Sequence, residues 1–190
     1  GIDFGDMEHL TYEILSAENG LVAKKYQNLF DEIYIRDIVR RNKLKKQGEL
    51  EDLLNILSSA IGSLTNPEKL KNTFRSVKNS SITTVTVNKY LKCLEDAFLI
   101  ESAQRYDIRG KAYIETPKKY YFSDLGLRNA RINFRQFEPT HAMENVIYNE
   151  LRNRRYSVDV GMVEVWQTKE DGVKEPTPER SASLKLLSAD

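Results

Sequence analysis

The sequence is short of cysteine, of long apolar runs and of a surplus of either charge, and each shortage excludes a class of protein. Cys93 is the one cysteine in 190 residues, which excludes an internal disulfide and a cysteine-rich zinc site. No segment approaches the roughly 18 to 20 consecutive apolar residues that cross a bilayer. The acidic start, residues 1–6, is unlike the basic start of a signal peptide. We therefore expect a cytoplasmic protein in which Cys93 is a packed or half-exposed helix residue.

The net charge and the histidine content indicate whether nucleic acid or metal ions are expected as ligands. The formal net charge of +1 gives no overall attraction to nucleic acid, so such attraction must come from local clusters of basic residues. The two histidines, His9 and His141, lie far apart and lack cysteine or acidic partners at the spacing of metal ligands. We therefore expect neither a metal ion nor another cofactor.

What the sequence does contain is helical periodicity, because apolar residues recur every three or four positions in several segments. The expected helices cover residues 21–41, 49–64, 67–77 and 84–98, with a polar connector over 42–48. Asn66 is suited to the N-cap of the third helix, with Pro67 in its first position and Val77 on its apolar face.

The fourth of these segments can be interpreted in two ways. Its start, residues 82–87, is rich in β-branched side chains and would also suit a strand. The threonines Thr83 and Thr84, however, can cap amides that a helix start leaves unpaired. We predict a helix, with Val85 and Phe98 turned toward the core.

Shorter segments complete the pattern. A strand at 99–103, a polar turn at 109–111 and a return strand at 119–123 are expected after the helices. Three helices followed by a two-stranded hairpin is the order of elements in a winged helix-turn-helix domain.

Beyond residue 127 the chain makes a new start. A helix is expected over 143–154, and the alternation over 156–160 and 162–166 is typical of paired strands. The predicted fold class is α+β, mainly helical. The predicted division is an N-terminal helical segment 1–45, a winged helix 46–126, an α/β unit 127–168 and a disordered tail 169–190.

Five stretches also carry a family resemblance. They are Ile35–Ile38, Thr84–Leu91, Leu94–Ile100, Pro117–Ala130 and Met143–Tyr148. Together they resemble the C-terminal region of a widespread family of prokaryotic AAA-type ATPases. The resemblance implies a parent architecture of an ATPase module, a winged helix and a domain of unknown function similar to restriction-endonuclease folds.

The chain departs from that family at both ends. It has no phosphate loop of the form Gly-x-x-x-x-Gly-Lys-Ser/Thr, so ATP hydrolysis by this chain alone is not expected. The family's acidic strand motif is absent after Val165, where residues 174–180 take its place. The resemblance therefore implies a winged helix without its ATPase module, followed by a partial restriction-endonuclease-like α/β domain.

A winged helix reads DNA by placing its third helix in the major groove, while nearby basic groups contact phosphates. The residues expected to face duplex DNA are Thr84, Thr86, Asn88, Lys89, Lys92, Arg105, Arg109 and Lys111. Around the hairpin, basic residues outnumber acidic ones by three when Lys118 and Lys119 are included. The sequence predicts a non-catalytic DNA-binding region.

Two other functions stay open. The winged helix could instead dock an ATPase domain or a partner chain, and an exposed apolar stripe on 21–39 would favour this interaction module. A nuclease would need clustered carboxylates and a lysine, for which the candidates are Glu144, Asp159, Glu164, Gln167 and Lys169. In the plainer interpretation, Glu144 anchors its helix and the two other acidic residues face outward from strands.

Overall fold

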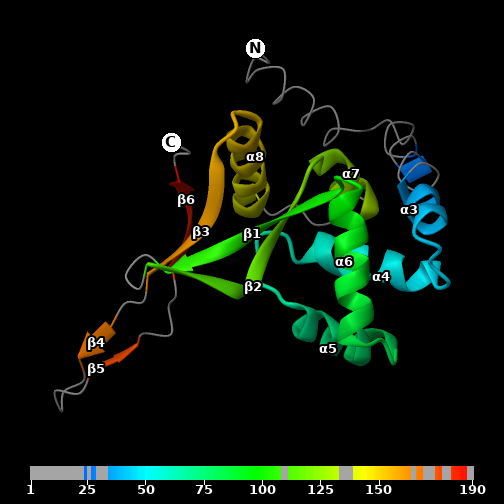
Figure 1. Ribbon diagram of the computed structural model, residues 1–190, viewed down its shortest axis with the longest axis horizontal. Helices are drawn as coiled ribbons and strands as arrows, with labels where there is room; N and C mark the ends of the chain where they lie inside the picture. Colours follow the sequence, from blue (N-terminus) through cyan, green and yellow to red (C-terminus); the bar gives the residue numbers. More distant parts are fainter. Residues whose placement is uncertain are drawn as a thin grey trace.

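The chain combines a group of helices with a small mixed sheet, so its fold class is α+β (Figure 1). The computed structural model describes residues 24, 27–28, 34–107, 111–132, 139–163, 166–168, 174–176 and 181–187, and from residue 162 onward the backbone alone. The helices are α3 (Arg36–Arg41), α4 (Gln47–Ser59), α5 (Pro67–Lys78), α6 (Thr84–Asp96), α7 (Leu125–Arg131) and α8 (Pro139–Asn153). The strands are β1 (Ile100–Asp107), β2 (Ala112–Phe122), β3 (Ser157–Val163), β4 (Trp166–Thr168), β5 (Lys174–Pro176) and β6 (Ser181–Leu187).

Helix α5 begins and ends as the sequence indicates. The side chain of Asn66 accepts a hydrogen bond from the amide of Lys69 at 2.7 Å, and Pro67 occupies the first helical position. The left-handed Asn79 ends the helix. The inward position predicted for Val77 is wrong, because the last turn of α5 extends past the core and leaves this side chain exposed.

Helix α6 confirms the helical interpretation of the β-branched run, with Thr83 as its N-cap. Its buried face is formed by Val87, Tyr90, Leu91, Cys93 and Leu94. Val85 precedes Val87 by two residues, about 200° around the helix, and is 78% exposed, so its predicted inward position is wrong. Phe98 is 84% exposed for another reason: it lies beyond the helix end with φ 55° and no longer follows the helical period.

The first predicted helix is described only in part. Helix α3 forms its C-terminal end, where Ile35 and Ile38 are buried in one apolar cluster that also contains residues of α4, α5 and α6. Most of residues 21–33 lie outside the described residues. Asn42 then ends the helix by donating its side-chain amide to the carbonyl of Ile38 at 3.0 Å.

The sheet has the strand order β2-β1-β3-β6. The hairpin strands β1 and β2 are antiparallel and longer than predicted, with a register shift between Ala103 and Arg105. Strand β3 runs parallel to β1, and between these two strands the chain returns through the antiparallel β2 and then forms α7 and α8. Strands from both sides of residue 126 therefore share one sheet, and the predicted domain division stays a prediction.

Two expectations for the C-terminal part are wrong. Residues 156–160 and 162–166 do not pair with each other, because Ser157–Val163 continues as one strand. Its antiparallel partner is β6, so the prediction of a disordered tail is also wrong for residues 181–187. The partners of β3 come from distant parts of the sequence, which local alternation cannot indicate.

Strand β2 joins two apolar clusters because its successive side chains point to opposite faces of the sheet. Tyr120 and Phe122 enter the cluster formed with the helices α3 to α7. Tyr121 enters a second cluster, where its ring stacks on Tyr148 of α8 with centroids 4.0 Å apart. Within the described part of the chain, no helix has the length and apolarity needed to cross a membrane.

Buried polar side chains fix the helices α7 and α8 to the rest. The amide of Asn145 accepts from the backbone N–H of Phe122 at 2.8 Å and donates to its carbonyl at 2.7 Å. The buried guanidinium of Arg128 donates to the Ser58 carbonyl at 2.8 Å, which satisfies an oxygen at the end of α4. These contacts hold β2, α7 and α8 in fixed positions relative to the three helices α4 to α6.

Candidate nucleic-acid interface

Helix α6 presents an exposed polar face, and three of the predicted DNA-facing residues lie on it. Asn88, Lys89 and Lys92 are all exposed. The ammonium of Lys92 lies 3.4 Å from the carboxylate of Asp96, so part of its charge is offset within the helix. Val85 adds an exposed apolar side chain that the sequence had assigned to the core. The face thus offers one amide, two cations and a methyl-bearing side chain.

The two threonines predicted on this face are engaged within the protein. The hydroxyl of Thr84 donates to Glu68 Oε2 at 3.1 Å, and the hydroxyls of Thr83 and Thr86 lie 3.0 Å apart. Hydrogen bonds from Lys71 and Thr84 lower the pKa of Glu68. Thr84 and Thr86 are half-buried, so they position the start of α6 and present less surface than Asn88 or Lys89.

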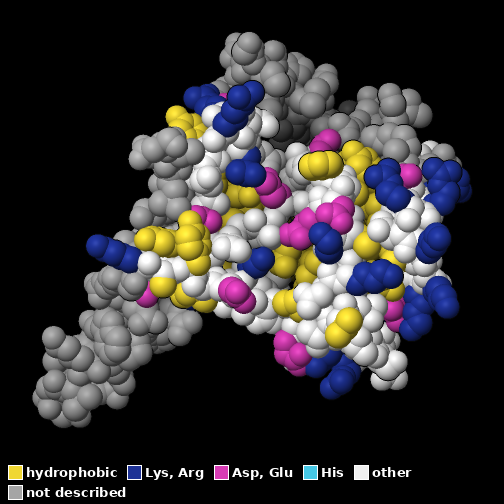
Figure 2. All heavy atoms as spheres, in the orientation of Figure 1, with side chains coloured by type: hydrophobic (Ala, Val, Ile, Leu, Met, Phe, Trp, Pro, Cys, Tyr) yellow, Lys and Arg dark blue, Asp and Glu magenta, His cyan; other side chains and the backbone are white. Residues whose placement is uncertain are grey.

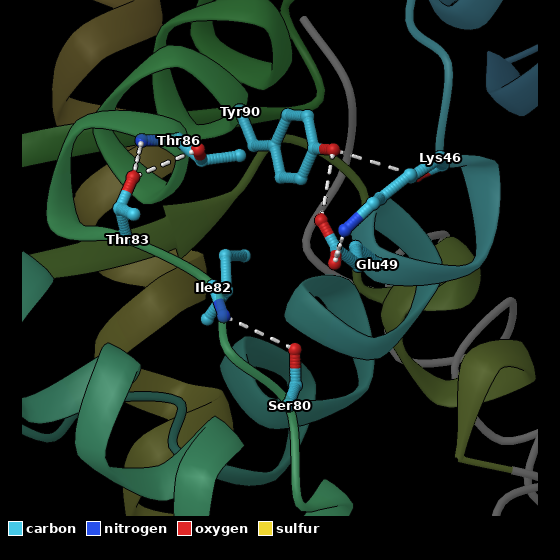
Figure 3. A network of polar contacts seen from close by, with 7 residues as sticks. All are labelled: Lys46, Glu49, Ser80, Ile82, Thr83, Thr86 and Tyr90. Carbon is cyan, nitrogen blue, oxygen red and sulfur yellow. Dashed lines mark hydrogen bonds and ion pairs between the residues drawn. The ribbon is translucent and has the colours of Figure 1, made fainter.

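A polar network holds the middle of α6 against the start of α4 (Figure 3). The hydroxyl of Tyr90 donates to Glu49 Oε2 at 3.3 Å and lies 3.5 Å from the carbonyl oxygen of Lys46. Lys46 in turn forms an ion pair with Glu49 at 2.8 Å. Burial is the largest cause of a raised pKa for Tyr90, and the charge of Glu49 is the next largest. The phenol therefore keeps its proton and can donate it in a hydrogen bond. The position of α6 is therefore fixed relative to the α3–α4 connection.

The hairpin supplies less basic surface than predicted. Arg105 is only 6% exposed, because it lies in β1 at the point where β3 pairs with that strand. The prediction that Arg105 faces duplex DNA is therefore wrong. Lys119 is 6% exposed and forms an ion pair with Glu144. Lys111 is exposed at the described end of the turn, and Arg109 lies outside the described residues. The predicted excess of three charges is therefore not found among the described residues of the hairpin.

Between α6 and the hairpin lies a polar cleft of about 260 Å³. It is lined by Thr65, Asn66, Pro67, Asn88, Gln104, Glu115, Thr116, Lys118 and Tyr120. A backbone pairing between Thr65 and Lys118, with both N···O distances 2.8 Å, closes one side. Asn88 of α6 and Gln104 of β1 thus both line the cleft. Gln104 was missed from the sequence, because which face of β1 it occupies depends on the register with β2 and β3.

The candidate nuclease residues Glu144 and Asp159 form hydrogen bonds within the protein. Glu144 Oε1 accepts from the ammonium of Lys119 at 2.6 Å and from the hydroxyl of Tyr121 at 2.8 Å. Burial and the charge of Glu144 raise the pKa of Tyr121 well above its ordinary value. Asp159 accepts from the hydroxyl of Tyr113 at 3.0 Å. Glu144 thus fastens α8 to β2, as the plainer interpretation expects.

The side chains of the other candidate nuclease residues lie outside the described part of the structure. Glu164 and Lys169 lie outside the described residues, and the side chain of Gln167 does as well. Among the residues that the structure describes, no group of three or more His, Cys, Asp or Glu side chains is arranged to hold a metal ion. Cys93 is buried in the helical cluster, as predicted, and burial raises its pKa.

Comparison with known proteins gives a family without a described activity. Residues 14–138 match the family described as a domain of unknown function, DUF8612, and the chain belongs to this family. An uncharacterized protein of Haemophilus influenzae is 36% identical over 151 residues, which is 80% of this chain and 38% of that protein. An uncharacterized protein of Methanocaldococcus jannaschii is 26% identical over 155 residues, 82% of this chain and 33% of that protein. This chain thus spans between a third and two fifths of the length of these relatives. No solved structure matches it significantly.

Proposed function

We propose that this chain is a non-catalytic, winged-helix DNA-binding region, with α6 as the helix that enters the major groove. The observation that carries the proposal is the exposed face of α6, where Asn88, Lys89 and Lys92 stand clear of the core. Three helices followed by the β1–β2 hairpin support it, because this is the order of elements in winged helices. Helices of this kind meet base edges with residues near their N-terminal end, which here includes Val85 and Asn88.

The chemistry of the face agrees with a duplex as partner. An asparagine can pair with an adenine edge through two hydrogen bonds, and an apolar side chain suits a thymine methyl group. Lys89 and Lys92 would contact phosphates, which fix the register of the protein on the duplex. Because Tyr90 ties α6 to Glu49, the face is presented without rearrangement of the helix.

The experiment is duplex binding followed by fluorescence anisotropy at several salt concentrations. The double variant K89Q/K92Q is expected to bind more weakly, with the slope of log K against log salt concentration smaller by up to about two units. The matched control is R154Q/R155N, which removes two positive charges just after the C-terminal end of α8. Equal binding by the control and K89Q/K92Q would contradict a role for α6, and no binding by the unchanged chain at low salt would contradict the proposal as a whole.

A second candidate is an interaction module, for which α8 provides an observation. Met143 and Ile147, one helical turn apart, are 60% and 46% exposed. The stripe on residues 21–39 gives no such support in its described part, where Ile35 and Ile38 are buried. The relatives are much longer than this chain, so a further module of the natural protein, an ATPase in our interpretation, is the proposed partner. Loss of co-purification in M143S/I147S would support this candidate.

The C-terminal part has a separate proposal. We infer that α8 and β3 belong to a partial restriction-endonuclease-like unit, on the basis of the family resemblance and of the order in which α8 is followed by β3, a strand parallel to β1. Replacing Glu144 by alanine tests a remaining hydrolytic role. Divalent-metal-dependent cleavage of duplex DNA that survives in E144A would remove this residue from the mechanism.

A further inference from the structure

A strongly basic segment of the described chain lies outside the residues so far assigned to DNA. The segment 36–46, which comprises α3 and the α3–α4 connection, holds six lysines and arginines and one acidic residue, Asp37. Its net charge is +5 in a chain whose formal net charge is +1. In Figure 2 dark-blue side chains gather along the right-hand edge of the molecule, where Figure 1 places α3 and the start of α4.

These cations are exposed, and two of them have no described carboxylate to offset them. Asp37 forms ion pairs with Arg40 and Arg41, whose side chains remain 85% and 68% exposed. Lys43 and Lys45 are exposed and form no ion pair with any residue in the described ranges. The charges of Lys43 and Lys45 are therefore available to an external anion, whereas that of Lys46 is offset by Glu49.

The segment is fixed in place beside α6. Ile35 and Ile38 are buried in the same apolar cluster as Val87 and Leu91 of α6. Leu44 packs against that cluster, and its amide donates to the carbonyl of Val39 at 3.0 Å. Through Lys46 the segment also joins the Tyr90 network (Figure 3).

The contact at Tyr90 sets the position of the segment relative to the proposed reading face. The contact places the α3–α4 connection at the level of residues 89 and 90 along the axis of α6.

We propose that the segment 36–46 contacts the phosphate backbone of the duplex that flanks α6, and that it supplies most of the electrostatic attraction. This inference rests on the proposed function, because it places the DNA against α6. A helix in the major groove lies between two rows of phosphates, so a rigid basic segment beside that helix meets one of the rows. The exposed cations of α6 and the hairpin are too few for this task, since Lys92 is near Asp96 and both Arg105 and Lys119 are buried.

The test compares salt-dependent binding of three variants of the full chain to a fluorescein-labelled duplex. K43Q/K45Q removes two cations without side-chain partners among the described residues, K89Q/K92Q removes two from α6, and R154Q/R155N is the matched control. For K43Q/K45Q we expect the slope of log K against log salt concentration to fall by about 1.8, the value for two lost phosphate contacts. The loss is expected to be the same on two duplexes of unrelated sequence, because phosphates carry no sequence information.

The possible outcomes separate the two claims. If the unchanged chain fails to bind duplex at low salt, both the proposed function and this inference are overturned. If K89Q/K92Q weakens binding while K43Q/K45Q keeps the original slope, only this inference is overturned. Tighter binding of poly-glutamate than of duplex, lost in K43Q/K45Q, would instead assign the segment to an acidic protein and overturn it as well. Reduced slopes in both variants, with the control unchanged, would support it.

Discussion

At Gly62 the backbone adopts a φ of 73°, a conformation that side chains disfavour. A Cβ atom built there would lie 2.6 Å from Cδ2 of His141, so the glycine also makes room for the start of α8. G62A is therefore expected to lower the free energy of unfolding by about 1–3 kcal/mol. Urea denaturation measures this, with G48A as the control.

Gly48 lies in the first turn of α4 with no atom within 4 Å of a Cβ placed on it. G48A is expected to leave the stability unchanged or to raise it by up to about 1 kcal/mol. Equal destabilisation by both substitutions would contradict the close contact between Gly62 and His141.

Single residues show what the sequence could and could not predict. The caps Asn66 and Thr83 were predictable because capping depends on the side chain and the next three residues alone. The burial of Arg105 and Lys119 was not, since it depends on the neighbours that β3 and α8 bring to the hairpin. For Lys119 one signal was available, because it directly precedes the aromatic run 120–122.

At the scale of elements, one buried side chain makes a large contribution to the docking of α8 on β2. Asn145 forms two hydrogen bonds with the backbone of Phe122, and the amide is fully buried. N145A would leave the buried N–H of Phe122 without this acceptor, whereas the carbonyl keeps the amide of Asn149 at 3.0 Å as a donor, so the expected cost is about 1–3 kcal/mol for the orphaned N–H. We expect a lower denaturation midpoint in urea, whereas N153A, at the exposed end of α8, should stay within about 0.5 kcal/mol of the unchanged chain. A midpoint for N145A equal to that of N153A would contradict this docking contact.

The elements themselves were predicted unequally. Helices α4, α5 and α6 follow from local periodicity, and their order before the hairpin was expected. The pairing of β3 with β1 and β6 was missed, because it joins segments that are far apart in the sequence. The candidate interface likewise has features that the sequence predicts and features that it does not. The exposed residues of α6 could be predicted from its helical period, whereas the charge that surrounds them depends on how distant segments pack.

At the scale of the whole molecule, three buried tyrosines link folding to alkaline pH. Burial raises the pKa of Tyr120, Tyr121 and Tyr148 above the ordinary value, whereas in the unfolded chain each ionises near pH 10. The unfolded state therefore loses protons that the folded state keeps, and stability that is complete below about pH 10 decreases as the pH rises further. Urea denaturation at a series of alkaline pH values measures the slope.

The variant Y121F tests this account of the alkaline slope. Because it removes one of the three groups, stability should fall less steeply with pH in Y121F than in the unchanged chain. A stability that does not change through this range, or an unaltered slope in Y121F, would contradict the assignment.

DNA binding through α6 can be followed residue by residue from the change in backbone amide chemical shifts of the isotope-labelled chain as duplex DNA is added. We expect the largest changes on exposed positions of α6, from Val85 to Lys92, and on residues 43–46. Smaller changes are expected along β1 and β2 near the cleft that Asn88 lines. Changes confined to α8 around Met143 and Ile147, or no changes at low salt, would contradict DNA binding through α6.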